Sequence, residues 1–330
     1  MTALLAAARS LARLLVGTAV LALAACGEPV RPPLSVGLNA WVGYDPLVLA
    51  RDRQQIDQGQ IKVVELATAS ETQRHLRNGL LDAAALTLDE VLRLRADGLD
   101  LRVVAVLDAS HGADVVMAMP NIHQVEHLRG RAVAVEDTSV GALMLDRMLQ
   151  SAGMSRSDVV VVQEEASLHQ DLLRSGRVSA VVSYAPLSGI LTNAGYRPLF
   201  SSDQIPGEIL DVLVVRTEVL RQRPDAVKAL LQAWQNGLAL MELDPVGAAA
   251  SLAPGTDLTS DDYLRVIGGL KFYTPAQSLA AMEGAPPELL VSAGRLAELL
   301  ADMGLLDEAP PLADLFDATP ARAALGRGGP

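Results

Sequence analysis

Trp41, Tyr44 and Tyr184 are the residues whose types and positions most suggest chemistry, and that chemistry is non-covalent recognition. Aromatic residues are scarce, since the 330-residue chain holds two tryptophans, five tyrosines and three phenylalanines. Trp41 and Tyr44 follow one predicted strand, and Tyr184 follows another. An aromatic ring offers a broad apolar or cation-attracting face with a polar edge. We expect these three rings to contact a ligand, the alternative being ordinary packing within their loops.

Carboxylates gather at similar positions near the ends of predicted strands. Such a group of acids would repel one another unless some are neutralised or hydrogen-bonded. We interpret Asp89 and Glu136 as the best candidates for ligand contact. The acids of this group are Asp45, Asp89, Asp108, Asp114, Glu136, Glu208 and Asp211.

Structural roles compete with ligand contact for most of these acids. Asp89 also suits a helix-capping position, and Asp108 and Asp114 could brace a turn through Ser110 and Gly112. We expect Glu208 and Asp211 to stabilise the hinge between the two halves of the molecule.

Two predicted helix starts add hydroxyl groups, at Thr68-Ala-Ser70 and at Thr138-Ser139. Backbone N–H groups point outward at such positions and can bind an oxyanion. No Arg or Lys lies within these motifs, so a sulfonate would lack a countercharge. Aromatic rings with acids favour an amine or a heteroaromatic nitrogen compound instead. The predicted ligand-binding set is Trp41, Tyr44, Ser70, Asp89, Ser110, Glu136, Thr138, Ser139 and Tyr184.

The stretch Leu21 to Pro33, LALAACGEPVRPP, contains the only cysteine of the chain. Before it, Arg9 and Arg13 precede an uncharged run that is too short to span a bilayer but suits a secretory signal peptide. Leu23-Ala-Ala-Cys26 resembles a bacterial lipobox, which implies lipidation of Cys26, with palmitate among the expected chains. We predict a signal peptide over 1–25 and a tether over 26–33. The alternatives are an ordinary secreted protein with one leftover cysteine, or a buried helix.

Composition restricts the possible partners. The net charge of −12 and the pI near 4.9 argue against nucleic acid, whose phosphates require a basic surface. A single cysteine allows no internal disulfide, so packing of the 50% apolar residues must stabilise the fold. We expect a monomer.

The sequence contains few combinations of residues that could form a catalytic site. His123 and His127 are spaced i, i+4, but no third metal ligand is apparent and we expect both on the surface. The chain has no H-E-x-x-H, no G-x-S-x-G and no Gly-rich phosphate loop. We therefore predict no metal, no cofactor and no enzymatic activity.

Short β-branched runs alternate with helical patterns, which is typical of an α/β protein with largely parallel sheets. We predict strands over 34–38, 61–66, 83–86, 101–107, 114–119, 131–135, 159–163, 180–183 and 211–215, and helices over 47–53, 88–96, 139–152 and 168–174. A further predicted helix is capped by Thr68-Ala-Ser-Glu71 and runs to about Asn78. From Glu218 onward the pattern is helical, which places Trp234, Phe272 and Tyr273 in helices, as core or inter-lobe contacts. We expect lobe 1 over 34–115 plus 208–310, lobe 2 over 116–207, and a flexible tail over 311–330.

Five stretches in order resemble one family: Leu38-Asn-Ala-Trp-Val-Gly-Tyr-Asp-Pro-Leu47, Leu86-Thr-Leu-Asp-Glu90, Asp108-Ala-Ser-His-Gly-Ala-Asp114, Val133-Ala-Val-Glu136 and Ile205-Pro-Gly-Glu-Ile-Leu-Asp-Val-Leu213. They are similar to the nitrate/sulfonate/taurine-type solute-binding proteins of ABC importers, which share a fold with thiamine-precursor binders. The resemblance covers about Leu34 to Arg216.

This resemblance implies a two-lobed type II periplasmic binding protein fold, each lobe a mainly parallel sheet flanked by helices, with a helical C-terminal region. It also implies capture of a small nitrogen- or sulfur-containing organic solute and delivery to a permease that works with an ATPase, by an exported protein held at the membrane. Where many relatives carry Tyr-Glu-Pro, this chain has Tyr184-Ala-Pro186, so their ligand need not be its ligand.

Two alternatives remain at this point. A sensing lobe for a signalling partner would bind a solute by the same physics. A pyrimidine-precursor synthase shares the fold, and in the resemblance it carries a cysteine-rich iron motif and a lysine for pyridoxal phosphate. The three lysines, Lys62, Lys228 and Lys271, lie outside the predicted cleft loops.

Overall fold

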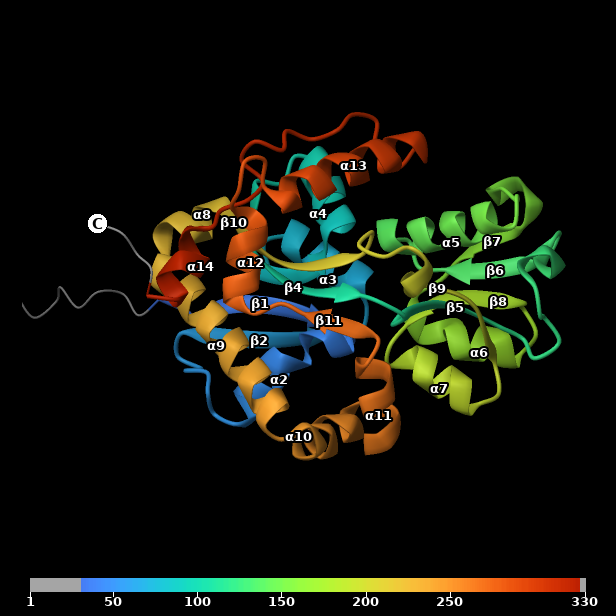
Figure 1. The fold of residues 1–330 in the computed structure, drawn as a ribbon, viewed down its shortest axis with the longest axis horizontal. Coiled ribbons are helices and arrows are strands. Elements are labelled where there is room, and N and C mark those ends of the chain that lie inside the picture. The colour runs from blue at the N-terminus through green and yellow to red at the C-terminus, as the bar shows by residue number, and fades with distance from the viewer. Residues whose placement is uncertain (1–30, 327–330) are drawn as a thin grey trace, which may run out of the picture. The chain divides into compact units, whose positions relative to one another are not determined.

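The computed structural model describes residues 31–326. The predicted signal peptide, Cys26 and most of the predicted tether lie outside this range. Within it the chain forms two β-sheets with helices packed around them (Figure 1). The helix–strand alternation predicted from the sequence is present. Among residues 31–326, no helix has both the length and the apolar character needed to cross a bilayer.

The larger sheet has the strand order β11-β4-β10-β3-β1-β2 and forms the body of lobe 1. Its strands are β1 (Leu34–Asn39), β2 (Ile61–Leu66), β3 (Ala83–Thr87), β4 (Leu101–Ser110), β10 (Leu210–Arg216) and β11 (Leu270–Phe272). Its helices are α2 (Asp45–Asp52), α3 (Ala69–Arg77), α4 (Leu88–Ala96), α8 (Thr217–Gln222), α9 (Pro224–Leu243), α10 (Pro245–Leu252), α11 (Ser260–Ile267), α12 (Pro275–Met282), α13 (Glu288–Asp302) and α14 (Thr319–Ala324).

The smaller sheet has the order β7-β6-β8-β5-β9 and forms lobe 2. Its strands are β5 (Asp114–Ala118), β6 (Ala132–Val135), β7 (Val160–Gln163), β8 (Ala180–Tyr184) and β9 (Arg197–Ser201). Its helices are α5 (Ser139–Ser151), α6 (His169–Arg174) and α7 (Leu187–Asn193).

The chain crosses from the larger sheet to the smaller one between β4 and β5, and it returns between β9 and β10 (Figure 1). These crossings correct the expectation of mainly parallel sheets. Strands β1, β2 and β3 are parallel, but β10 runs antiparallel to both β3 and β4. In the smaller sheet β5 is antiparallel to β8 and β9. A strand that leaves a sheet and one that returns to it run in opposite directions, so both sheets are mixed.

Burial explains why the central strands have near-continuous apolar sequences. Every residue of β3 is buried, as is every residue of β5, because helices cover both faces. Helix α9 packs closely on α2 at Gly237, where a Cβ atom would lie 1.9 Å from the carbonyl oxygen of Pro46. Only glycine permits this approach of two backbones.

The C-terminal region differs from its prediction in two ways. Phe272 lies in the edge strand β11 and Tyr273 directly follows it, rather than in a helix. Trp234 is helical and fully buried, and its indole donates to the Tyr273 carbonyl at 2.9 Å.

The segment expected to be a flexible tail is packed over its described part. Leu315 is fully buried, and Asp314 forms ion pairs with Arg95 and Arg102. Helix α14 packs on α9. Apolar residues spaced among Ala, Gly and Pro thus suffice to dock this segment on lobe 1.

Candidate functional site

A small cavity lies between the two lobes, with a volume of about 30 Å³. The loop after β1, the start of α3 and the β3–α4 junction contribute from lobe 1, and β5, α5 and β8 contribute from lobe 2. We name it the cleft cavity. Its lining residues are Asn39, Trp41, Tyr44, Ala69, Thr87, Glu90, Asp114, Val140, Tyr184 and Asp211.

Trp41 and Tyr44 are held by a tight turn after β1. Val42–Tyr44 form one turn of 3-10 helix, in which the Tyr44 N–H donates to the Trp41 carbonyl at 3.0 Å. Gly43 leaves room inside this turn, because a Cβ atom there would lie 2.2 Å from Trp41 Nε1 and 2.4 Å from Asp108 Oδ2. Both side chains are nearly completely buried, and the Tyr44 hydroxyl donates to Asp211 Oδ1.

The aromatic wall of the cleft cavity comes from both lobes. Trp41 of lobe 1 meets Tyr184 of lobe 2 edge to face, with ring centroids 6.0 Å apart and an interplanar angle of 76°. Tyr184 ends strand β8 and lies opposite Asp114 of β5. Separation of the lobes would therefore part the two rings and open the cavity.

Buried acids give this region its electrostatic character. Burial raises the pKa of Asp114 to about 7, and the Ser110 side chain moderates the rise. Burial raises the pKa of Glu90 well above its ordinary value, and the charge of Asp89 adds to the effect. Burial likewise raises the pKa of both Tyr44 and Tyr184. The buried setting of these acids therefore favours their protonated forms.

Asp108 and Asp211 form a carboxyl pair across two strands. They are opposite each other in the antiparallel ladder of β4 and β10. Burial raises the pKa of Asp108 to about 7, and burial together with the nearby Asp108 raises the pKa of Asp211 well above its usual range. Two like charges so close cannot both ionise at low cost, so the pair retains a proton near neutral pH.

Several buried polar atoms around the cleft cavity have no hydrogen-bond partner among residues 31–326. Such atoms are costly, and each calls for an explanation such as a ligand or a water. In the cavity wall and beside it they are Glu90 Oε1, Asp114 Oδ2 and Ser183 Oγ.

A hydrogen-bonded contact, which we name the clasp, joins the lobes beside the cavity. Ser70 lies in the first turn of α3, whose N-cap is Thr68. The Ser70 N–H donates to Glu136 Oε1 of lobe 2 at 3.0 Å, and the Ser70 hydroxyl lies 2.6 Å from the same oxygen. The Tyr184 hydroxyl donates to Glu136 Oε2 at 3.2 Å. The carboxylate of Glu136 thus occupies the N-terminus of α3.

A second lobe 2 acid reinforces the clasp. Glu165 Oε2 lies 2.9 Å from the Ser70 hydroxyl, and its Oε1 accepts from Arg74 of α3 at 3.3 Å. Beyond the clasp lies a polar cavity of about 410 Å³, which we name the outer cavity. It is lined by Ser70, Gln73, Arg74, Arg77, Arg93, Glu136, Asp137, Gln163, Glu164 and Glu165.

The structure places the sequence-predicted residues in three groups. Trp41, Tyr44 and Tyr184 line the cleft cavity, and Ser70 and Glu136 form the clasp. Asp89 and Ser139 are buried nearby but line neither cavity.

Ser110 and Thr138 have local structural partners. The Ser110 hydroxyl lies 2.7 Å from that of Ser202 and accepts from the Asp114 N–H at 3.1 Å. Thr138 caps α5 by accepting from the Gly141 N–H at 3.1 Å. The backbone groups that an anion could have used at this helix start are therefore partly satisfied.

The sequence prediction did not select Glu90, and it assigned Asp114 and Asp211 to bracing and hinge roles. In the structure all three line the cleft cavity. The available signal for Asp114 and Asp211 was their position in the strands at the two crossings, β5 and β10, whereas Glu90 lies in the first turn of α4. Glu208, the other predicted hinge acid, instead pairs with Arg147 at 2.7 Å.

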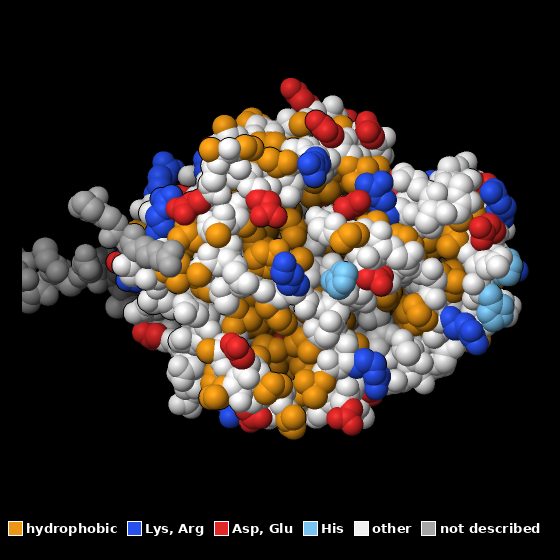
Figure 2. All heavy atoms as spheres, in the orientation of Figure 1, with side chains coloured by type: hydrophobic (Ala, Val, Ile, Leu, Met, Phe, Trp, Pro, Cys, Tyr) orange, Lys and Arg blue, Asp and Glu red, His pale blue; other side chains and the backbone are white. Residues whose placement is uncertain are grey.

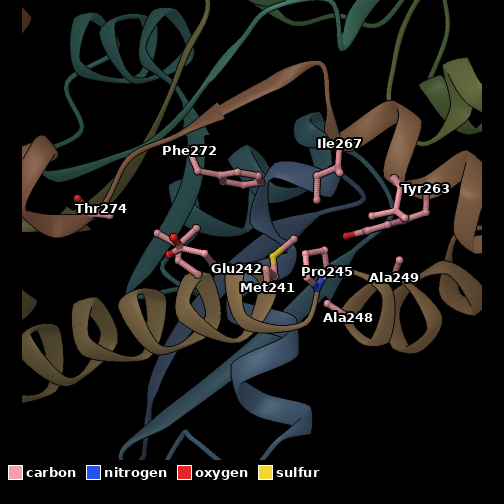
Figure 3. Close-up of a pocket in the computed structure, with 11 residues that line it drawn as sticks. Met241, Glu242, Pro245, Ala248, Ala249, Tyr263, Ile267, Phe272 and Thr274 are labelled. Atoms are coloured by element: carbon pink, nitrogen blue, oxygen red, sulfur yellow. The ribbon is translucent and has the colours of Figure 1, made fainter.

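A larger hollow lies away from the cleft, among α9, α10, α11 and β11, with a volume of about 300 Å³ (Figure 3). Figure 2 shows hydrophobic side chains gathered around a hollow over these elements. We name it the apolar cavity. It is lined by Leu238, Met241, Glu242, Pro245, Ala248, Ala249, Tyr263, Leu264, Ile267, Phe272 and Thr274.

The Tyr263 ring points into the apolar cavity, and its hydroxyl donates to Asp45 Oδ2 at 2.5 Å (Figure 3). Burial raises the pKa of Asp45 to about 7. Helix α11 also reaches lobe 2, since the Asn193 side chain of α7 donates to Asp262 at 2.9 Å. This side of the molecule therefore provides another contact between the lobes.

The predicted surface histidines, His123 and His127, are both exposed. Over residues 31–326, no group of three or more His, Cys, Asp or Glu side chains is placed to hold a metal ion.

Two mixed α/β sheets joined by two crossings, with a cavity between them, define the type II periplasmic binding protein fold. A model of the NMT1-like family matches residues 27–253, which is more than half of the chain. The chain therefore belongs to the NMT1-like family. A binding protein of Brucella abortus (strain 2308) is 26% identical over 123 residues, which are 36% of this chain and 39% of that protein. The chain thus matches well under half the length of that curated relative.

Solved structures with a similar fold include two binding proteins. The alkanesulfonate-binding protein SsuA from Xanthomonas axonopodis pv. citri, bound to MOPS, has a TM-score of 0.76 at 18% identity, over 88% of this chain and 99% of that one. The periplasmic nitrate-binding protein NrtA from Synechocystis PCC 6803 has a TM-score of 0.72 at 13% identity, over 91% and 90%.

An enzyme shares the fold as well. The desulfurization enzyme DSZB has a TM-score of 0.65 at 18% identity, over 90% of this chain and 99% of the enzyme. The fold is therefore common to binding proteins and to at least one catalyst, and the site must distinguish them.

Proposed function

We propose that this protein is the extracytoplasmic solute-binding component of an ABC importer. It captures a small nitrogen- or sulfur-containing organic solute between its lobes and delivers it to a permease that works with an ATPase. The observation that carries the proposal is the cleft cavity, to which both lobes contribute aromatic and unpaired polar groups. A solute bound to both lobes stabilises the closed form and shifts the population toward it.

The lining of the cleft cavity supports binding rather than catalysis. Its lining residues include no Cys, His, Lys or Ser, the residues that most often act together as nucleophile and base. The clasp supports lobe closure, because Ser70 and Glu136 are hydrogen-bonded across the cleft beside the cavity.

Fluorescence and small-angle X-ray scattering would test solute capture by the full-length protein. The chain has two tryptophans, of which Trp41 lines the cleft cavity and Trp234 is in the core. Titration with small amines, guanidines and sulfonates should change the Trp41 emission and reduce the radius of gyration. Trp234→Phe should keep the fluorescence response, and Trp41→Phe should remove it. A radius of gyration that stays constant with every solute would contradict the proposal.

We also propose that Cys26 is diacylated and anchors the protein, as a monomer, outside the cytoplasm. The lipobox-like sequence Leu23-Ala-Ala-Cys26 supports this proposal. Labelled palmitate should be incorporated into the wild-type protein and not into Cys26→Ser. Incorporation into both, or into neither, would contradict the anchor.

Delivery to a permease separates the importer from a sensing lobe. In vesicles carrying the neighbouring permease and ATPase, the solute-loaded protein should stimulate ATP hydrolysis. Stimulation of a membrane kinase with no effect on the ATPase would favour the sensing role.

A further inference from the structure

We infer that the solute is a small organic cation with N–H groups, such as a primary ammonium, an amidinium or a guanidinium. This inference rests on the proposed function and names the chemical class that the cleft cavity selects. It differs from what the names of the two similar binding proteins indicate, since those bind an alkanesulfonate and nitrate.

The charge of the cavity lining is the first reason. Glu90, Asp114 and Asp211 contribute carboxyl groups, whereas none of the lining residues is Arg, Lys or His. These three side chains are 1%, 6% and 1% exposed, so water cannot screen them. A cation brought among them would favour ionisation of the carboxyls, whereas an anion would oppose it.

The unpaired oxygens are the second reason, and they also indicate N–H donors. Glu90 Oε1 and Asp114 Oδ2 accept no hydrogen bond from any described residue, whereas Asp211 is paired with Asp108. Other oxygens of these acids are engaged in two cases, since Glu90 Oε2 accepts from the Thr87 N–H at 3.1 Å and Asp211 Oδ1 accepts from Tyr44. Ionised carboxylates only accept hydrogen bonds, so their match is a donor. A quaternary ammonium offers charge without donors.

The third reason is that the position for an anion is already filled. A helix N-terminus is a ready site for an anion, because its backbone N–H groups are free. At the start of α3 the Glu136 carboxylate accepts from the Ser70 N–H. A sulfonate would have to displace Glu136 and break the clasp that holds the lobes together.

The aromatic wall is compatible with the same solute. Trp41 and Tyr184 line the cavity from opposite lobes and contact each other edge to face, and parting them would expose ring faces that attract cations. The outer cavity, by contrast, is lined by Arg74, Arg77 and Arg93. Of these, Arg74 pairs with Glu165 and Arg77 pairs with Asp97.

The test is a titration of the full-length protein with solutes that share one carbon skeleton. Propylamine, propylguanidine, propyltrimethylammonium and propanesulfonate form one series, and their benzyl counterparts form a second. Calorimetry gives the affinity, and scattering reports closure. The amine or guanidine of at least one series should bind at least about 10-fold more tightly than the quaternary ammonium and the sulfonate of that series.

Each result has a distinct meaning. Binding of a sulfonate or a quaternary ammonium as tight as that of the matching N–H cation would overturn the assigned solute class and leave the proposed function standing. No binding and no closure with any member of either series would overturn both the solute class and the proposed function.

A pair of variants tests whether the acids of the cleft cavity bind the cation. Asp114→Asn removes one unpaired acid from the cleft cavity and should weaken binding of the N–H cation by about 10- to 100-fold. The matched control is Glu242→Gln, which neutralises an acid in the lining of the apolar cavity and should change the affinity by less than about twofold. Equal affinities of Asp114→Asn and wild type would overturn the assignment. A melting temperature of Asp114→Asn at or above that of wild type would show that lost binding is not lost folding.

Discussion

The apolar cavity has a volume of about 300 Å³ and the cleft cavity about 30 Å³. Among the described residues that line these two cavities, the buried acids belong to the smaller one. Two polar groups of the larger hollow are engaged, since Tyr263 donates to Asp45 and Thr274 caps α12. Both lobes build the smaller hollow, whereas elements of the C-terminal helical region build the larger. The difference shows that buried polar atoms without hydrogen-bond partners indicate a binding site better than the volume of a cavity does.

Truncation of an aromatic residue should have the largest effect on stability and on solute-induced closure when that residue lines the cleft cavity. Trp41→Ala should lower the free energy of unfolding by about 3–5 kcal/mol, because Trp41 is buried and the surrounding core cannot collapse onto the gap. Its solute-induced closure should also disappear. Phe272→Ala, in the wall of the apolar cavity, is the matched change and should cost less, because Phe272 is only partly buried. Urea denaturation and scattering measure both. If Phe272→Ala lost more of the solute-induced closure than Trp41→Ala, the apolar cavity and not the cleft cavity would be the more important for closure.

The stability of the solute-free protein should rise as the pH falls from about 8 to 5.5. Asp114 and Asp108 have pKa values of about 7 in the folded protein, against about 3.8 when unfolded. The folded state therefore binds more protons over this window, and each group adds about 1.4 kcal/mol per pH unit below its folded pKa. The effect is lost as the pH rises through 7. Charged or titratable groups near Asp114 are Asp89 on α4, Asp108 on β4, Tyr184 on β8 and Asp211 on β10.

Urea denaturation at several pH values measures this effect, and Asp114→Asn should reduce its slope. Asp45 contributes in the same direction beside the apolar cavity, since its pKa is also about 7. Asp45→Asn therefore shows how much of the pH dependence arises outside the cleft. An unchanged slope in Asp114→Asn would mean that the cleft acids are not the source.

Breaking the clasp should destabilise the closed form by an intermediate amount. It should also allow the cleft to bind an anionic solute. Glu136→Ala removes charge-assisted hydrogen bonds worth about 1.5–3 kcal/mol to the closed form. It also frees the N-terminus of α3, so propanesulfonate should gain affinity by about 10-fold or more. The control is Glu164→Ala, which lines the same outer cavity without contacting Ser70. Calorimetry that finds the same sulfonate affinity in both variants would refute a role of Glu136 in excluding anions.

Filling the apolar cavity should have the smallest effect. Ala248 is buried and points into this hollow (Figure 3). Ala248→Leu should stabilise the protein by about 1 kcal/mol through added apolar contact. Solute affinity should stay within about twofold of wild type by calorimetry. A large loss of affinity would mean that this hollow, and not only the cleft cavity, takes part in binding.

Much of the fold was predictable because strands such as β2 and β6 are short β-branched runs separated by helices with clear ends. The missed strands are both at sheet edges. Strand β9 contains Pro198, which an edge position tolerates, and β11 has three residues, too few for any periodicity. Phe272 was therefore placed in a helix. The lobe bounds predicted at 115/116 and 207/208 remain proposals.

The candidate site was only partly predictable. Trp41, Tyr44 and Tyr184 were selected because aromatic residues are rare in this chain and these three follow strands. Asp211 was assigned to the hinge. Its hydrogen bond with Tyr44 could not be predicted, because the two residues are far apart in the sequence. Glu90 was not selected, since the same pattern also fits the first turn of a helix.

By itself, the sequence determined most of the strands and helices, that aromatic residues and acids follow strand ends, and that a lone cysteine ends a hydrophobic run. Only the tertiary structure decided that Glu90, Asp114 and Asp211 surround one cavity and that Glu136 fills the start of α3. The physical reason is that secondary structure depends on neighbours along the chain. The charge and the free hydrogen-bonding groups of the cleft depend instead on how two lobes close against each other.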